Sequence, residues 1–159
     1  MNHSPEEHAG AGATLNRVAL MATLHCLSGC AVGEVLGMVI GTALEFSNAT
    51  TIGLAIVLAF FFGYAFTIVP LVRAGIAPRR VLRLALAADT ASITVMEIVD
   101  NLVMVLIPGA MDAGLRDLLF WAALAFSLIV AGLAAFPINR YLIARGKGHA
   151  VLHAHHSHH

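Results

Sequence analysis

The stretch that decides the fold is RVALMATLHCLSGCAVGEVLGMVIGTALE, from Arg17 to Glu45. Between its charged ends it is mostly apolar and small, and Glu34 is its only acidic residue. A transmembrane α-helix needs roughly 20 predominantly apolar residues. The stretch therefore predicts a membrane-spanning helix, and the same reasoning predicts three more, at about Thr51 to Arg73, Arg83 to Pro108 and Leu118 to Asn139.

The overall composition agrees with a membrane protein. Of the 159 residues, 59% are hydrophobic and 11% charged, and the mean hydropathy is +0.85. Soluble domains carry about 25% charged residues. The net charge is zero with His neutral, so nothing indicates a nucleic-acid partner. We expect an all-α integral membrane four-helix bundle with short connections, surrounded by lipid.

Basic residues predict how the bundle is oriented. Arg17 precedes the first span, an arginine cluster separates the second from the third, and Arg140 and Arg145 follow the fourth. The two remaining loops hold only Arg116. By the positive-inside rule, both termini and the middle loop are predicted to be cytoplasmic.

Three segments are expected along the chain. Residues 1–15 form a polar N-terminal segment that lacks the basic start and apolar core of a signal peptide. Residues 16–147 form the four-helix membrane domain. Residues 148–159 form a histidine-rich tail, which is either a collector of soft metal ions or a polar end or purification remnant. The histidines of this tail are His149, His153, His155, His156, His158 and His159.

Four carboxylates lie at membrane depth, and the spans contain no Lys or Arg to neutralise them. They are Glu34, Asp89, Glu97 and Asp100. Each ionisable group costs on the order of 2.5–3.5 kcal/mol on insertion scales. Such acids must be protonated, hydrated or bound to cations, so a purely structural role for all four is not expected.

Helical periodicity places these acids in line with sulfur atoms. At about 100° per residue, Cys26, Cys30 and Glu34 form one stripe that Met38 continues. In the third span, Asp89, Met96 and Asp100 form a second stripe, with Met104 near it and Glu97 to one side. If the two stripes face each other, thiols, thioethers and carboxylates line one pathway across the bundle.

Depth counted from the flanking arginines predicts two layers. Glu34 lies seventeen residues after Arg17, and Glu97 seventeen after Arg80. Residues at matched counts lie at matched depth. The predicted inner layer contains His25, Cys26, Tyr64 and Asp89, and the predicted outer layer contains Glu34, Glu97 and Asp100.

These residue types suggest a transition-metal site. Two cysteines at i and i+4 can present both sulfurs to one ion, as two histidines do in HExxH helices. Thiolate with imidazole and carboxylate suits zinc, whereas thiolate with thioether suits Cu(I), and the sequence leaves both metals open. The candidate ligands are His25, Cys26, Cys30, Glu34, Asp89, Glu97 and Asp100, with Tyr64, Met96, Asn101 and Met104 as accessory candidates.

A glycine repeat marks a packing face of the first span. Gly29, Gly33, Gly37 and Gly41 recur every four residues, and such small-residue stripes let membrane helices approach closely. The partner is either a neighbouring helix or a second copy of the chain. Because four helices enclose little pore volume, we expect a homo-oligomer. The fourth span is apolar throughout and is interpreted as a scaffold that faces lipid.

Two stretches resemble an uncharacterised bacterial membrane family, a domain of unknown function. They are TLHCLSGCAVGE, from Thr23 to Glu34, and FPINRYLIARGKGH, from Phe136 to His149. The resemblance implies a small four-helix, multi-pass protein of the bacterial inner (plasma) membrane whose histidine-rich tail is natural. It implies no established activity.

Four functions compete. The leading hypothesis is a transition-metal transporter, channel or binding subunit that holds the ion with thiol and carboxylate ligands. The second is a metal-dependent membrane enzyme, although the sequence has no recognised catalytic motif. The third is a proton or redox relay through the four acids, and the fourth is a structural subunit of a membrane complex.

Overall fold

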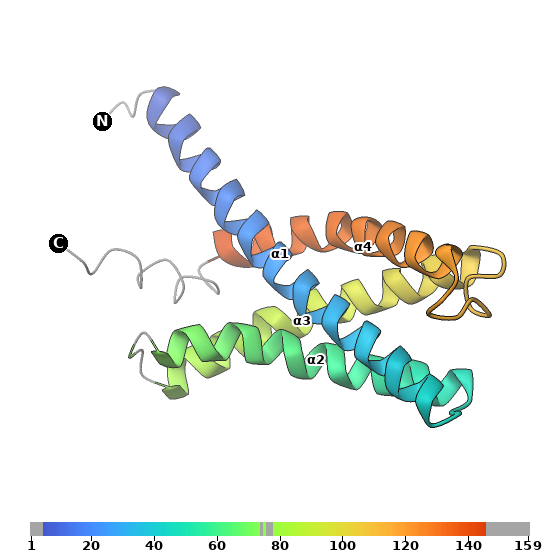
Figure 1. Ribbon diagram of the computed structural model, residues 1–159. Coiled ribbons are helices and arrows are strands. Elements are labelled where there is room, and N and C mark those ends of the chain that lie inside the picture. The colour runs from blue at the N-terminus through green and yellow to red at the C-terminus, as the bar shows by residue number, and fades with distance from the viewer. Residues whose placement is uncertain (1–4, 74, 76–77, 146–159) are drawn as a thin grey trace.

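The computed structural model describes residues 5–73, 75 and 78–145, and these residues form four α-helices without a β-strand (Figure 1). The all-α, four-helix prediction is confirmed. The histidine-rich tail predicted at 148–159 lies outside the described residues. The helices are α1 Pro5–Ala43, α2 Asn48–Arg73, α3 Pro78–Leu106 and α4 Leu118–Ala144.

Each of the four helices extends beyond its predicted span at one end. Helix α1 begins at Pro5, inside the segment expected to be a polar extension. Proline suits a helix start, because the N–H group that it lacks would have no partner within the helix. Helix α4 continues past Asn139, the predicted end of the fourth span, to Ala144.

Among the described residues, three helices are long and apolar enough to cross a membrane. The qualifying segments are Ala13–Ala43 in α1, Asn48–Pro70 in α2 and Leu118–Ala144 in α4. Helix α3 falls short on composition, because it carries three arginines and three acids. Its polar groups are distributed unevenly, however. Asp89, Glu97 and Asp100 are buried, while Ile98 and Leu102 are exposed.

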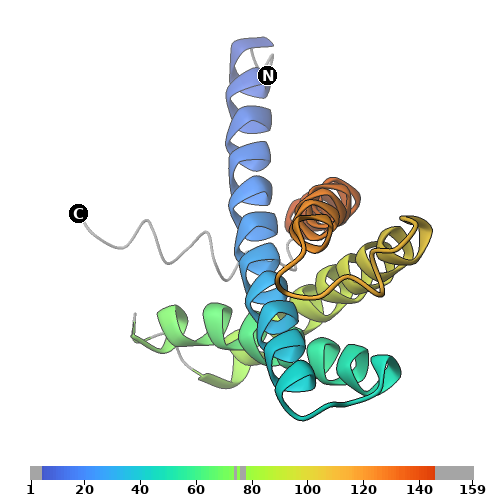
Figure 2. The ribbon, with the colours of Figure 1, turned by 45° about the vertical axis from the view of Figure 1, so that its right-hand side comes forward.

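Helix α1 contacts each of the other three helices. It packs most extensively against α2 and also contacts α4 and α3. Figure 2 shows the first half of α1 extending beyond the other helices, so the shared core forms around its second half. That core includes Cys26 and Cys30 together with Ile93 and Met96 of α3 and small residues of α2 and α4.

The glycine stripe brings the backbones of α1 and α2 together. A Cβ atom on Gly33 would lie 2.2 Å from the backbone nitrogen of Ala59, and one on Gly29 would lie 2.6 Å from Cα of Gly63. Gly37 faces Ala55 in the same way. Only glycine permits so close an approach. The stripe therefore packs within the chain, and Gly41 completes it against the Thr51 side chain.

We expect Gly33→Ala to lower the free energy of unfolding by about 1–3 kcal/mol, because the added methyl overpacks a backbone contact. The matched control is Gly53→Ala in α2, where a Cβ atom meets nothing within 4 Å. Helix content measured by circular dichroism during an SDS titration compares the two variants. Equal midpoints would contradict the close α1–α2 contact.

Candidate functional site

The second half of α1 turns a thiol and acid face into the bundle. Cys26, Cys30 and Glu34 follow one another at four-residue steps, and all three are buried. A four-residue step advances a helix by about one turn, so these side chains lie above one another. Both cysteines are free thiols. The helix therefore presents a column of two sulfurs and one carboxyl group.

Helix α3 supplies the facing acids. The Cys26 thiol donates a hydrogen bond to Asp89 Oδ1 at 3.7 Å. Cys30 interacts electrostatically with Glu97, and Glu34 with Asp100 and Glu97. The structure thus brings the two predicted stripes together, and each α1 group meets an acid of α3.

The predicted inner layer is only partly assembled. Cys26 and Asp89 meet, and His25 is near enough to Asp89 for an electrostatic interaction. However, His25 is an exposed residue whose ring packs edge-on against Phe66, with centroids 5.9 Å apart. The Tyr64 hydroxyl pairs with Thr90 at 2.8 Å. Tyr64 therefore packs beside the thiols, and its hydroxyl group pairs with Thr90 rather than with an acid.

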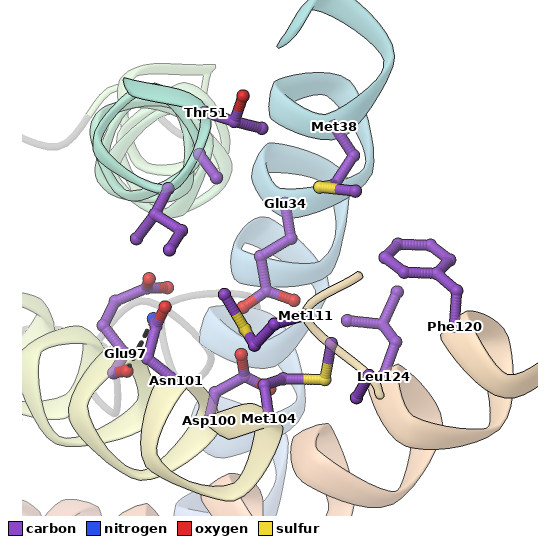
Figure 3. A pocket seen from close by; sticks show the side chains of 13 residues that line it. Glu34, Met38, Thr51, Glu97, Asp100, Asn101, Met104, Met111, Phe120 and Leu124 are labelled. Atoms are coloured by element: carbon purple, nitrogen blue, oxygen red, sulfur yellow. Dashed lines mark hydrogen bonds between the residues drawn. The ribbon is translucent and has the colours of Figure 1, made fainter. Parts of the chain in front are cut away.

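The predicted outer layer surrounds a cavity of about 70 Å³ (Figure 3). Glu34, Glu97 and Asp100 line it, and so do the accessory candidates Asn101 and Met104. The Asn101 amide donates to the Glu97 backbone carbonyl at 2.9 Å, which fixes its side chain beside the cavity. This volume is enough for an ion with water molecules.

The carboxyl groups of this site have fewer hydrogen-bond partners among the described residues than they have oxygen atoms. Six of their buried oxygen atoms accept no hydrogen bond from the described residues. They are both oxygens of Glu34, both of Glu97, Oδ2 of Asp89 and Oδ1 of Asp100. An unpaired buried polar atom costs free energy, and a buried charge costs far more. The site therefore needs protons, water or a cation.

Metal-ligand geometry is not preformed. Within the described part of the chain, no three His, Cys, Asp or Glu side chains lie together in an arrangement that could hold a metal ion. The accessory candidate Met96 is buried in the core with Cys26 and Cys30, away from the cavity. Any ion bound by three such ligands requires the side chains to rotate.

Helix α4 contributes polar groups that the sequence interpretation missed. It was expected to be a scaffold facing lipid, but one of its faces is buried and includes Ser127 and Asn139. The Asn139 amide donates to Thr23 of α1 at 2.9 Å and to Ser92 of α3 at 3.0 Å. Ser127 interacts with Asp100. The sequence feature that could have indicated this buried face is the presence of single polar residues in an otherwise apolar helix.

One further residue reaches the cavity from a loop. Met111 follows α3 and lines the cavity together with Ala110. Nothing in its local sequence separates it from an ordinary loop residue. Only the fold, which brings this loop beside Glu34 and Met38 of α1, places it there.

The chain belongs to the family described as Domain of unknown function (DUF4396), whose model matches residues 15–148. This match confirms the resemblance to an uncharacterised domain family. No curated protein and no solved structure matches the chain.

We expect Asn139→Ala to destabilise the bundle by about 1–3 kcal/mol, because it removes the donor shared by two buried hydroxyl groups. The control is Asn16→Ala, which removes an exposed hydrogen bond from Arg140 and should change stability by less than about 0.5 kcal/mol. The same SDS titration measures both. Indistinguishable variants would show that the α1–α3–α4 hydrogen bonds do not stabilise the core.

Proposed function

We propose that this protein binds a transition-metal cation inside the membrane and carries it along the α1–α3 face in exchange for protons. Cys26, Cys30 and Glu34, with Asp89, Glu97 and Asp100, replace the water ligands of the ion. Metal binding to thiols and carboxyl groups releases their protons. This row of thiols and carboxyl groups between α1 and α3 can therefore hold either protons or a cation.

The observation that carries this proposal is the set of six buried carboxylate oxygens without a hydrogen-bond partner. Carboxylates buried in a bilayer are costly and mark ion or proton pathways. Three of the four acids line one cavity, and a cation there compensates their charge directly. A purely structural role offers no such compensation.

The thiols give the row its preference for transition metals. Each cysteine lies beside an acid, Cys26 with Asp89 and Cys30 with Glu97. Thiolate ligands select zinc and Cu(I) over magnesium and calcium. Because three ligands are not preformed, binding includes a rotation of side chains that brings sulfur and oxygen onto the ion.

The proposal includes all four helices as membrane spans. Helix α3 points its acids inward and exposes Ile98, Leu102 and Val105, so its outer surface is compatible with lipid. Positive-inside logic places both termini in the cytoplasm. The protein is then a multi-pass component of a bacterial inner membrane, and any second copy packs on a surface other than the glycine stripe.

The thiols are tested by metal content. The full-length protein, purified without metal-affinity steps and incubated with zinc or Cu(I), is analysed by elemental mass spectrometry. We expect Cys26→Ser with Cys30→Ser to abolish tight binding, and Asp89→Asn to weaken it by about 10–100-fold because it removes the carboxylate charge beside the Cys26 thiol. Ser28→Ala, an exposed change on the same helix, is the control. Unchanged binding in the double variant would remove the thiols from the site.

A proton relay is the second candidate. It is favoured by the three acids that share the cavity and by the absence of three preformed ligands among the described residues. In this case protons pass between the carboxyl groups, as in membrane pumps, and the thiols are incidental.

Proton flux separates the two candidates. Metal-free protein in liposomes, with a pH-sensitive dye inside, is exposed to a pH gradient. A relay predicts flux that Glu34→Gln or Asp100→Asn abolishes and that the cysteine variant retains. Asp112→Asn, at an exposed loop position, is the matched control. No flux without metal would exclude the relay and leave metal transport.

A further inference from the structure

The cavity beside Glu34 has a wall of thioether groups. Met38 of α1, Met104 of α3 and Met111 of the following loop all line it. The chain has six methionines, so half of them meet at one small cavity although they come from three separate segments. Figure 3 shows Met104 and Met111 beside the carboxyl groups of Glu34 and Asp100, with Met38 further along α1.

The acids at this wall are deeply buried and point into the same space. Glu34 is 7% exposed and Asp100 is 4% exposed. Both oxygens of Glu34 and one of Asp100 lack a hydrogen-bond partner among the described residues. Methionine often fills gaps in apolar cores. Here, however, the thioethers share a cavity with uncompensated carboxyl groups.

This combination selects a particular kind of ion. A thioether is a soft, neutral ligand that suits Cu(I), whereas carboxylate and water suit magnesium, calcium and manganese. Thioethers carry no proton, so they can accept an ion without first losing one. The carboxylates supply the negative charge that compensates an ion leaving water.

We propose that this cavity binds a soft monovalent cation, Cu(I) or its analogue Ag(I), beside the thiols of α1. The inference rests on the proposed function and narrows its substrate to soft monovalent ions. Glu34 connects the two sites, because it lines the cavity and follows Cys30 by one helical turn, about 6 Å. Glu97 also lines the cavity and interacts with Cys30.

The test uses full-length protein carrying Cys26→Ser and Cys30→Ser, so that methionine is the remaining source of sulfur ligands. Ag(I) is added in a chloride-free nitrate buffer, and X-ray absorption at the silver edge detects sulfur neighbours. The histidine-rich tail offers only nitrogen ligands and is present in every sample. We expect silver–sulfur scattering in this cysteine-free protein.

Replacing Met38, Met104 and Met111 with Leu in the same background should remove the silver–sulfur signal and weaken Ag(I) binding by about tenfold or more. Leu conserves the volume of Met and costs less than about 1.5 kcal/mol, and circular dichroism checks the fold. The matched control is Met96→Leu, because Met96 is 1% exposed but lies outside the cavity. It should leave the signal unchanged.

Two results would overturn this cation site. One is the absence of silver–sulfur scattering in the cysteine-free protein, and the other is its persistence after the three cavity methionines are replaced. In either case, metal bound through sulfur by the cysteine-intact protein would leave the proposed function standing. If the cysteine-intact protein also shows no metal bound through sulfur, both the cavity site and the proposed function are rejected.

Discussion

Uncompensated acids between α1 and α3 are the constraint on which the rest of the structure depends. Glu34 of α1 interacts with Glu97 and Asp100 of α3. Asp89 accepts a hydrogen bond from the Cys26 thiol. Turning these groups inward leaves α3 with an apolar outer surface. The same burial leaves carboxylate oxygens without partners, and this deficit is what a proton or a cation satisfies.

The neighbouring helices hold this arrangement in place by two different means. On one side, glycine allows α1 to contact the backbone of α2 at Gly33 and Ala59. On the other side, Asn139 of α4 joins Thr23 of α1 to Ser92 of α3. Close packing and buried hydrogen bonds thus hold α1 in place on both sides of the acids.

The proposed function rests on the order of chemical groups between α1 and α3. Thioethers and carboxylates meet at the cavity, and thiols paired with acids continue along α1. Soft ions prefer sulfur ligands, whereas hard ions prefer oxygen ligands. A proton relay uses the same acids but assigns no part to the sulfur atoms, and this difference separates the two proposals physically.

The amino-acid sequence alone determined the helices and the stripes, because hydrophobic length and a 100° periodicity are local properties. Cys26 and Glu34 share a face wherever α1 packs. The sequence could not say which helix covers the glycines, that Asn139 is buried, or that Met111 reaches the cavity. Those facts depend on contacts between segments far apart in the chain, and only the tertiary structure decides them.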